Sequence, residues 1–330
     1  MKHHHKLHRF SIILILTTIT ITLLACNTVS EPQQLTIGIA TSAGPLGPPV
    51  IAGFKEGMAE FGYVEGETIT YLIPDVTEDS QEAYLPVVQT LLDANVDLIL
   101  AIGTPVATVA APMVEGTDVP VVFAPAVNPV EAGLVDNMRQ PGGNLTGIKA
   151  GGFFPKELEW LTQIAPDVRV VWLPNHGSDG GSVATVTEAQ QIASSLGVEL
   201  LIADVESGEE MVAALEAIPD EVDAILVAPA ALLAGQLSNI IAAGEARDLP
   251  VVFHHHHRLE EGLLLSFGPS IGLIGKQASQ TVDQILKGAK PGDLPVDTAE
   301  FLLGINLKRA EALGLTVPEA VVRQANTIVR

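Results

Sequence analysis

Four consecutive histidines, His254 to His257, are the residues whose types point most directly to chemistry. Imidazole groups bind metal ions, hydrogen-bond to polar ligands and change charge near neutral pH. In an extended segment alternate side chains point to opposite sides, so His254 and His256 would share one face and only part of the run could converge with His176. We favour direct contact of these imidazoles with an organic ligand, which would make binding depend on pH. A zinc site and a solvated polar loop are the alternatives.

The rest of the sequence lacks the motifs of zinc sites and of enzymes. Zinc normally takes three or four ligands, and helical zinc motifs place histidines at i and i+4, a spacing that the run does not have. The chain also contains no second cysteine and histidine cluster, although Glu260 and Glu261 follow closely. It has no Gly-x-Ser-x-Gly elbow, no His-Glu-x-x-His, no Gly-Lys-Ser/Thr phosphate loop and no dinucleotide-binding glycine fingerprint. We therefore expect a binding protein without a metal or other cofactor, and not an enzyme.

Short β-branched segments alternate with segments of helical periodicity, which is typical of parallel α/β sheets. Strands are predicted at 35–40, 68–73, 96–101, 119–123, 168–173 and 199–203, and helices at 50–61, 81–94, 106–113, 183–195 and 211–217. The motif Val-Asp-x-Ile-Leu occurs at 96–100 and again at 222–226, and Pro-Val-Val-Phe occurs at 120–123 and again at 250–253. This recurrence predicts two related lobes, with chance similarity between valine-rich strands as the alternative.

The recurrence places the histidines after a parallel strand, at the sheet edge where α/β proteins bind ligands. Two such lobes would form a cleft bordered by loops at 41–47, 103–105, 124–128, 175–182, 229–231 and 254–258. Thr104 suits a helix N-cap and Pro105 the first helical position, so the exposed amides there favour an anion such as a ligand carboxylate. The candidate ligand-binding residues are Ser42, Ala43, Gly103, Thr104, Pro105, Ala126, Asn128, Asn175, His176, Pro229, Ala230, His254, His256, Ser266 and Phe267.

Each part of this candidate site has a structural alternative. The segment 103–105 would also suit an ordinary capped helix, and 175–178 would suit a flexible glycine and serine turn. Phe267 would serve equally well as a core residue or as a surface for the ligand. Few aromatic residues are predicted at the cleft rim, which weakens the case for a stacked aromatic ligand.

The amino-terminal segment resembles an export signal. Basic residues precede an apolar run from Phe10 to Ala25, and Leu23-Leu24-Ala25-Cys26 has the form of a bacterial lipobox. We expect residues 1–26 to be a signal peptide that ends at a lipidated Cys26, followed by a polar tether at 27–34; an uncleaved anchor with an incidental cysteine is the alternative. Because Cys26 is the sole cysteine, no internal disulfide can form, and the formal net charge of −22 argues against nucleic acid or an anionic membrane surface as a partner.

Several motifs together resemble a known family. They lie at 53–66, 101–105, 128–135, 140–147, 285–291 and 305–310, and they are similar to motifs of the ABC-transporter substrate-binding lipoproteins of tryptophan/tyrosine-binding-like type. The resemblance covers nearly all of the chain after Cys26. It implies a type 1 periplasmic-binding fold, α/β with two Rossmann-like lobes whose parallel sheets are joined by a three-crossover hinge. The histidine run departs from the usual pattern of this family, which leaves the identity of the ligand open.

The resemblance also implies a division of the chain and a function. The first lobe would comprise 35–147 and 268–294, and the second lobe 148–267 and 295–330. We expect an extracytoplasmic, lipid-anchored and monomeric solute-binding protein that closes on a small polar ligand such as an amino acid and presents it to an ABC permease. A sensory receptor for a signalling partner, or a zinc-binding protein, is the alternative.

Overall fold

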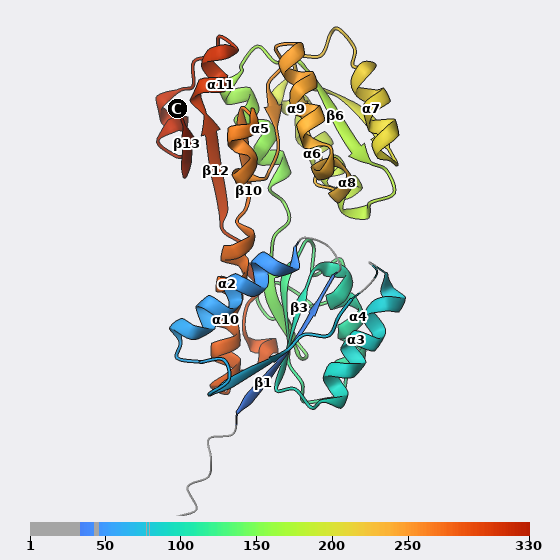
Figure 1. The fold of residues 1–330 in the computed structure, drawn as a ribbon, viewed down its shortest axis with the longest axis vertical. Coiled ribbons are helices and arrows are strands. Elements are labelled where there is room, and N and C mark those ends of the chain that lie inside the picture. Colours follow the sequence, from blue (N-terminus) through green and yellow to red (C-terminus); the bar gives the residue numbers. More distant parts are fainter. Residues whose placement is uncertain (1–33, 43–45, 77, 79) are drawn as a thin grey trace, which may run out of the picture.

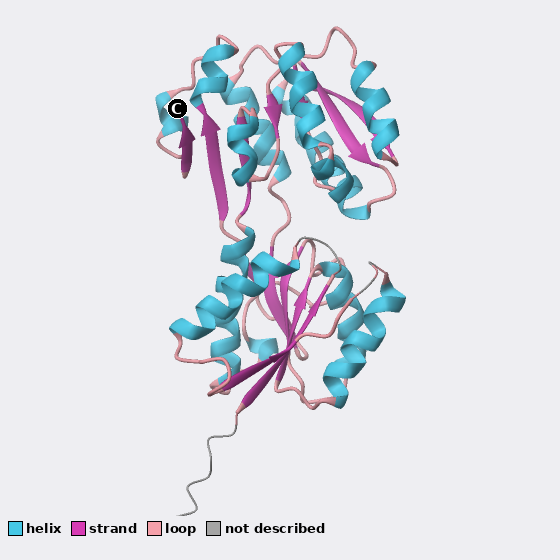
Figure 2. Cartoon of the chain, in the orientation of Figure 1, coloured by secondary structure: helices cyan, strands magenta, loops and turns pink. Residues whose placement is uncertain are grey.

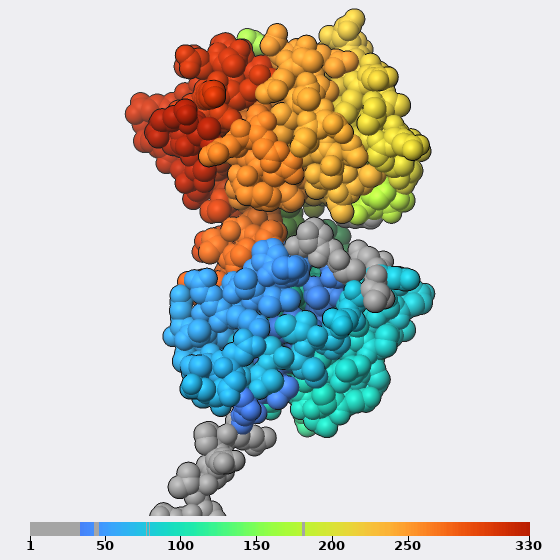
Figure 3. All heavy atoms as spheres, viewed as in Figure 1, coloured from blue at the N-terminus to red at the C-terminus, as the bar shows by residue number. Residues whose placement is uncertain are grey.

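Two lobes joined by a narrow waist make up the molecule (Figure 1, Figure 3). The computed structural model describes residues 34–42, 46–76, 78 and 80–330. Each lobe has a central sheet with helices packed against it (Figure 2), which confirms the predicted α/β class. In the described part of the chain, no helix is both long enough and apolar enough to cross a membrane. Cys26, the signal peptide and most of the tether lie outside the described residues.

The sheet of the first lobe has the strand order β11-β5-β4-β3-β1-β2, and all of its pairs are parallel. Its elements are β1 (Leu35–Thr41), α2 (Gly47–Glu60), β2 (Ile69–Leu72), α3 (Gln81–Asp93), β3 (Leu98–Ile102), α4 (Thr104–Val114), β4 (Val121–Ala126), β5 (Leu145–Lys149), α10 (Ile271–Leu286), η3 (Pro291–Asp293) and β11 (Asp297–Thr298). Along β3, Leu98 and Leu100 pack with α2 and α10, whereas Ile99 and Ala101 pack with α3 and α4. Because side chains alternate along a strand, covering both faces requires the unbroken apolar run that the sequence shows.

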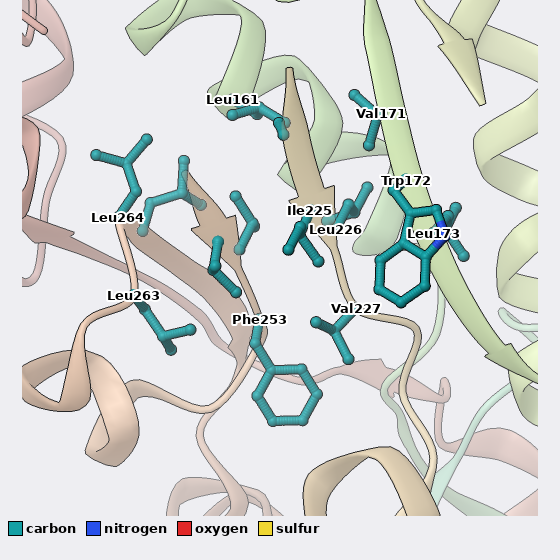
Figure 4. Packing of buried hydrophobic residues seen from close by; sticks show 14 of the residues in the cluster. Leu161, Val171, Trp172, Leu173, Ile225, Leu226, Val227, Phe253, Leu263 and Leu264 are labelled. Carbon is teal, nitrogen blue, oxygen red and sulfur yellow. The ribbon is translucent and has the colours of Figure 1, made fainter. Parts of the chain in front are cut away.

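The sheet of the second lobe has the order β13-β12-β10-β9-β8-β6-β7. Its elements are α5 (Phe154–Ile164), β6 (Val170–His176), α6 (Gly180–Ala193), η1 (Ser194–Leu196), β7 (Glu199–Val205), α7 (Gly208–Glu216), β8 (Ala224–Leu226), α8 (Ala231–Gly235), α9 (Leu237–Ala246), β9 (Val251–Val252), η2 (His256–Glu261), β10 (Leu265–Pro269), β12 (Phe301–Asn306), α11 (Leu307–Ala312), α12 (Glu319–Val322) and β13 (Thr327–Val329). β10 and β12 are antiparallel, and the other pairs are parallel. Figure 4 shows apolar side chains of β6 and β8 gathered with Leu161 of α5 and with Phe253, and Val251 and Val252 of β9 belong to the same buried cluster.

The two lobes repeat one topology, as the recurring motifs predicted. The order β5-β4-β3-β1-β2 in the first lobe corresponds to β10-β9-β8-β6-β7 in the second. The Val-Asp-x-Ile-Leu motif leads into β3 and β8, and the Pro-Val-Val-Phe motif leads into β4 and β9. The histidine run therefore follows β9 in the place where 124–129 follows β4.

The chain passes between the lobes three times, at 150–153, at Ser270 and at 299–300. Two hydrogen bonds tie these segments together: the Ala299 N–H donates to the Lys149 carbonyl at 2.7 Å, and the Ser270 N–H donates to the Glu300 carbonyl at 3.2 Å. The lobe boundaries expected after residues 147, 267 and 294 lie a few residues earlier than these passages. The reason is that β5 and β10 continue to pair with their neighbours up to Lys149 and Pro269, and that β11 still belongs to the first sheet.

Candidate functional site

The carboxyl ends of the parallel strands of both lobes point toward the waist, whereas β12 and β13 of the second lobe run in the opposite direction (Figure 1). A cavity of about 120 Å³ lies there and takes lining from both lobes and from the first passage. It is lined by Val127, Ala150, Gly151, Gly152, Phe153, Phe154, Ala184, Thr185, Glu188 and Pro229. A larger cavity of about 900 Å³ is lined wholly by first-lobe residues between 108 and 145. The smaller cavity is therefore the better candidate for a site that responds to movement of the lobes.

The first-lobe side of the site is built by the turn from β3 into α4. The sequence predicted Thr104 as the N-cap; instead Gly103 is the N-cap, with φ of 99°, and Thr104 and Pro105 are the first two helical residues. Glycine adopts this backbone conformation readily, so the turn is made one residue earlier than predicted. The Thr104 Oγ1 accepts a hydrogen bond from the Val127 N–H at 3.0 Å and so fixes the loop after β4 against the start of α4. That bond connects Gly103–Pro105 with the cavity, because Val127 lines it.

The predicted residues after β6 are engaged within the second lobe. Asn175 is 3% exposed; its Nδ2 donates to the Asp204 Oδ1 and its Oδ1 accepts from the Ser182 hydroxyl, both at 2.7 Å. His176 Nε2 lies 3.1 Å from the Ser178 Oγ and 3.5 Å from a Glu206 carboxylate oxygen. These contacts stabilise the turn between β6 and α6, and neither residue lines the cavity.

The histidine run does not adopt the extended conformation on which the sequence interpretation relied. The η2 turn begins at His256, so the alternation of sides is lost. The His254 ring lies 5.5 Å from the Phe153 ring and 4.2 Å from the Phe253 ring, between ring centroids, and its Nδ1 is buried without a hydrogen-bond partner in the described part of the chain. The rings of His255 and His257 stack on each other at 5.2 Å. The run is therefore packed as a small ring cluster at the edge of the second lobe.

His256 links η2 to β10. Its Nε2 lies 2.9 Å from the Gly268 carbonyl, which can only accept, so Nε2 carries the proton. Its Nδ1 then accepts a hydrogen bond from the Ser266 hydroxyl at 3.1 Å. His256 and Ser266, both predicted ligand-binding residues, are therefore hydrogen-bonded to each other. Gly268 and Ser266 belong to β10, the strand that leads out of the second lobe. The His256 imidazole therefore fixes η2 to the strand that precedes the passage at Ser270.

Burial changes the expected titration of these imidazoles. It lowers the pKa of His254 well below the usual value, and repulsion from the neighbouring imidazoles adds to the effect. Burial, with His257 and Arg258 nearby, lowers the pKa of His255 to about 4. The pKa of His256 is lowered by burial although its bond to the Gly268 carbonyl opposes the shift. The expectation of titration near neutrality is therefore wrong for His254 and His255, whose pKa values lie well below neutral pH. In the described residues, no group of three or more histidine, cysteine, aspartate or glutamate side chains is placed to hold a metal ion.

We expect His256→Ala to lower the free energy of unfolding by about 1–3 kcal/mol, because the Ser266 hydroxyl is left buried without its partner. Urea unfolding monitored by circular dichroism measures the change. His257→Ala is the control, since His257 is exposed, and it should change stability by less than about 0.5 kcal/mol. Equal effects of the two substitutions would contradict a structural role for His256.

The remaining predicted residues are distributed around the cavity. Pro229 lines it, and Ala126 and Asn128 flank the lining residue Val127. Ala230 is the N-cap of α8, and Ser42 directly follows β1. Ala43 lies outside the described residues.

Sequence reasoning missed the residues of the first passage and the acid on α6. Gly151 and Gly152 allow the first passage to approach the loop after β4, because a Cβ on Gly151 would lie 2.5 Å from the Val127 carbonyl oxygen. The segment Gly-Gly-Phe-Phe-Pro after β5 was the available signal. Glu188 gave no signal, since it is one of 39 acidic residues of the chain and lies in a predicted helix rather than in a predicted cleft loop.

Aromatic rings are more numerous at the waist than the sequence predicted. Phe153 lies 5.8 Å from Phe301, Phe301 lies 5.8 Å from Phe267, and Phe267 lies 6.4 Å from Trp160, between ring centroids. The three phenylalanines belong to the segments that lead into or out of the passages between lobes. Phe267 is half-buried in this row.

Comparison with known proteins gives a consistent result. The family model described as ABC transporter substrate binding protein matches residues 48–329. A curated relative, the tyrosine-binding protein of Clostridioides difficile (strain R20291), is 24% identical over 252 residues, which cover 75% of this chain and 71% of the relative.

Solved structures agree with this match. The crystal structure of an ABC domain in complex with L-Trp from Streptococcus pneumonia is 26% identical with a TM-score of 0.76, covering 90% of this chain and 100% of that one. The ligand-free, open structure of a substrate binding protein with adhesive properties from Clostridium difficile is 23% identical with a TM-score of 0.73, covering 90% of this chain and 99% of that one. The resemblance seen in the sequence and the type 1 periplasmic-binding fold that it implied are confirmed.

Proposed function

Because the chain belongs to the family of ABC transporter substrate-binding proteins, we propose that it captures an amino acid or a closely related small molecule and presents it to a membrane permease. Proteins of this family bind small ligands outside the cytoplasm and work with ABC permeases. The observation that carries the proposal is the cavity between the opposed strand ends, which takes lining from both lobes. A ligand that contacts both lobes would favour the closed arrangement and so report its presence to the permease.

The class of ligand follows from the chemistry around the cavity and from the relatives. Backbone amides at the start of α4 suit a carboxylate, and the row of Phe153, Phe301 and Phe267 offers an apolar surface beside the cavity. A relative is described as tyrosine-binding, and a similar structure holds L-Trp. These points together favour an amino acid. The alternative zinc function gains no support from the packing of the histidine run.

Attachment to the membrane is part of the proposal. The lipobox at 23–26 predicts a lipidated Cys26, and the polar segment that follows would hold a monomeric receptor close to its permease. The intact mass of protein extracted from membranes reveals whether the lipid is present.

Ligand binding should raise the midpoint of thermal unfolding of the full chain in detergent. The panel contains the common amino acids, small carboxylates, sugars and purines, each with added zinc and with a chelator. A ligand at one hundred times its dissociation constant adds about 2.7 kcal/mol to the free energy of unfolding, which is a shift of several degrees. We expect one amino acid or a small group of them to give this shift with or without chelator. A shift produced by zinc alone, or by no organic compound, would contradict the proposal.

A further inference from the structure

Glu188 is the one ionisable side chain among the described residues that line the cavity between the lobes. It lies on α6 of the second lobe, and the other lining residues are apolar side chains, glycine backbone and Thr185. A carboxylate in such surroundings has lost part of its hydration. The cavity therefore contains a concentrated negative charge on one wall.

This charge is not neutralised by a direct partner. Burial is the largest influence on Glu188 and raises its pKa; Lys149 lowers it by attraction, and Glu131 raises it by repulsion. In the described part of the chain the carboxylate forms neither a hydrogen bond nor an ion pair. Lys149 lies at the end of β5, where a Cβ on Gly152 would be 4.0 Å from its Nζ. The ammonium group of Lys149 therefore lies beside the first passage and attracts Glu188 without pairing with it.

We propose that Glu188 binds the ammonium group of the ligand, so that the preferred ligands of this site carry a primary amine. This inference rests on the proposed function and adds to it which end of the ligand the second lobe recognises. Closure of the lobes removes water from the cavity, and an ion pair gains strength as the surrounding dielectric constant falls. An ammonium group placed there supplies the hydrogen bonds and the positive charge that the carboxylate lacks.

The geometry assigns opposite ends of a zwitterion to opposite lobes. The start of α4 and Lys149 belong to the first lobe, where a ligand carboxylate is favoured. Glu188 belongs to the second lobe and faces the same cavity. A molecule that carries both charges would hold the lobes together, whereas a molecule with one charge would engage one lobe only.

The test measures the affinities of L-tyrosine and L-tryptophan and of their counterparts without the amine, 3-(4-hydroxyphenyl)propionate and indole-3-propionate. Isothermal titration calorimetry is performed on the full chain in detergent, on the Glu188→Gln variant and on the Glu131→Gln variant. Gln keeps the size of the side chain and removes its charge. Glu131 is the matched control, because it is an exposed acid that repels the Glu188 carboxylate but does not line the cavity.

We expect the wild-type protein to bind at least one of the amino acids about 10- to 100-fold more tightly than the counterpart that lacks the amine. Glu188→Gln should weaken binding of the amino acid by a similar factor and leave the counterpart nearly unchanged, so that the preference for the amine disappears. Glu131→Gln should retain that preference. The unfolding midpoint of each variant is measured alongside and should stay at or above that of the wild type.

Three outcomes overturn the inference and are distinguishable from one another. If the wild type binds the amino acids and Glu188→Gln retains the preference for the amine, the role of Glu188 is wrong while the receptor function stands. If the wild type binds none of the four probes and no compound of the wider panel, the proposed function itself fails, and the inference fails with it. Binding that depends only on the carboxylate, with no preference for the amine in the wild type, also overturns it.

Discussion

Gly275→Ala is expected to lower the free energy of unfolding by about 2–4 kcal/mol, because it forces apart two helices that touch through their backbones. Figure 1 shows α2 and α10 side by side in the first lobe. A Cβ on Gly275 of α10 would lie 2.0 Å from the Val50 carbonyl oxygen and 2.7 Å from the Phe54 nitrogen of α2. Backbone atoms cannot rotate away as a long side chain can, so the helices must separate. Gly53 makes the reciprocal approach, with its Cβ position 2.0 Å from the Gly272 carbonyl oxygen.

Urea and thermal unfolding of the full chain measure this effect. Gly235→Ala is the control, because this residue ends α8 and no heavy atom lies within 4 Å of the added Cβ. We expect the control to change stability by less than about 1 kcal/mol, in the direction of a gain, since alanine is the better helix former. If the two variants unfold alike, the close contact of α2 and α10 is not what holds α10 in the first lobe.

This helix contact also explains why the chain can leave the second lobe at Ser270 and be held so firmly in the first. The family resemblance alone assigned residues 268–294, which contain α10, to the first lobe. The glycines at 53, 57, 272 and 275 lie on the two helix faces that meet, but their spacing alone does not show that these two helices are partners. Periodicity identifies each helix, but it does not identify the partner, because packing between elements far apart in sequence leaves no local pattern.

The candidate site, like the fold, could be predicted from the sequence only in part. The edge at which it lies followed from parallel strands and recurring motifs. Val127 and Pro229 from the loops at 124–128 and 229–231 line the cavity, and Thr104 reaches it only through its hydrogen bond with Val127. The histidine run was misjudged because its conformation depends on tertiary partners, namely Ser266 and Gly268 of β10. Glu188 was missed for a related reason: its importance arises from the lining opposite, which the first passage supplies.

Glu157→Gln is the second change from which we expect a large effect, and it acts on the pH dependence of stability. Glu157 lies in the first turn of α5, is 0% exposed, and neither carboxylate oxygen has a hydrogen-bond partner of normal geometry in the described part of the chain. Burial raises its pKa well above the usual value, and the nearby backbone amide of Phe267 opposes this only in part. The folded protein therefore keeps this group protonated at pH values where the unfolded chain, with a pKa of 4.5, has released the proton.

The sign of the effect follows from proton linkage. Below pH 4.5 both states are protonated and Glu157 has no influence on the pH dependence. As the pH rises above 4.5, unfolding releases a proton, so wild-type stability falls by up to roughly 1.4 kcal/mol per pH unit until the folded pKa is reached. Glutamine has no proton to release. We expect Glu157→Gln to become progressively more stable than the wild type between pH 5 and 8, by on the order of 1–3 kcal/mol at pH 8.

The difference between the two unfolding free energies, measured at several pH values, isolates this group from the histidines. His254, His255 and His256 have lowered pKa values in the folded state, so their contribution to stability is complete above pH 6.5 and is lost as the pH falls below it, for His255 through about 4. That contribution is common to both proteins and cancels in the difference. Glu159→Gln is the matched control on the same helix, because Glu159 is only partly buried and pairs with Lys156. A difference curve for Glu157→Gln as flat as that of the control would mean that the folded protein holds Glu157 ionised, which requires a partner for its carboxylate inside the second lobe.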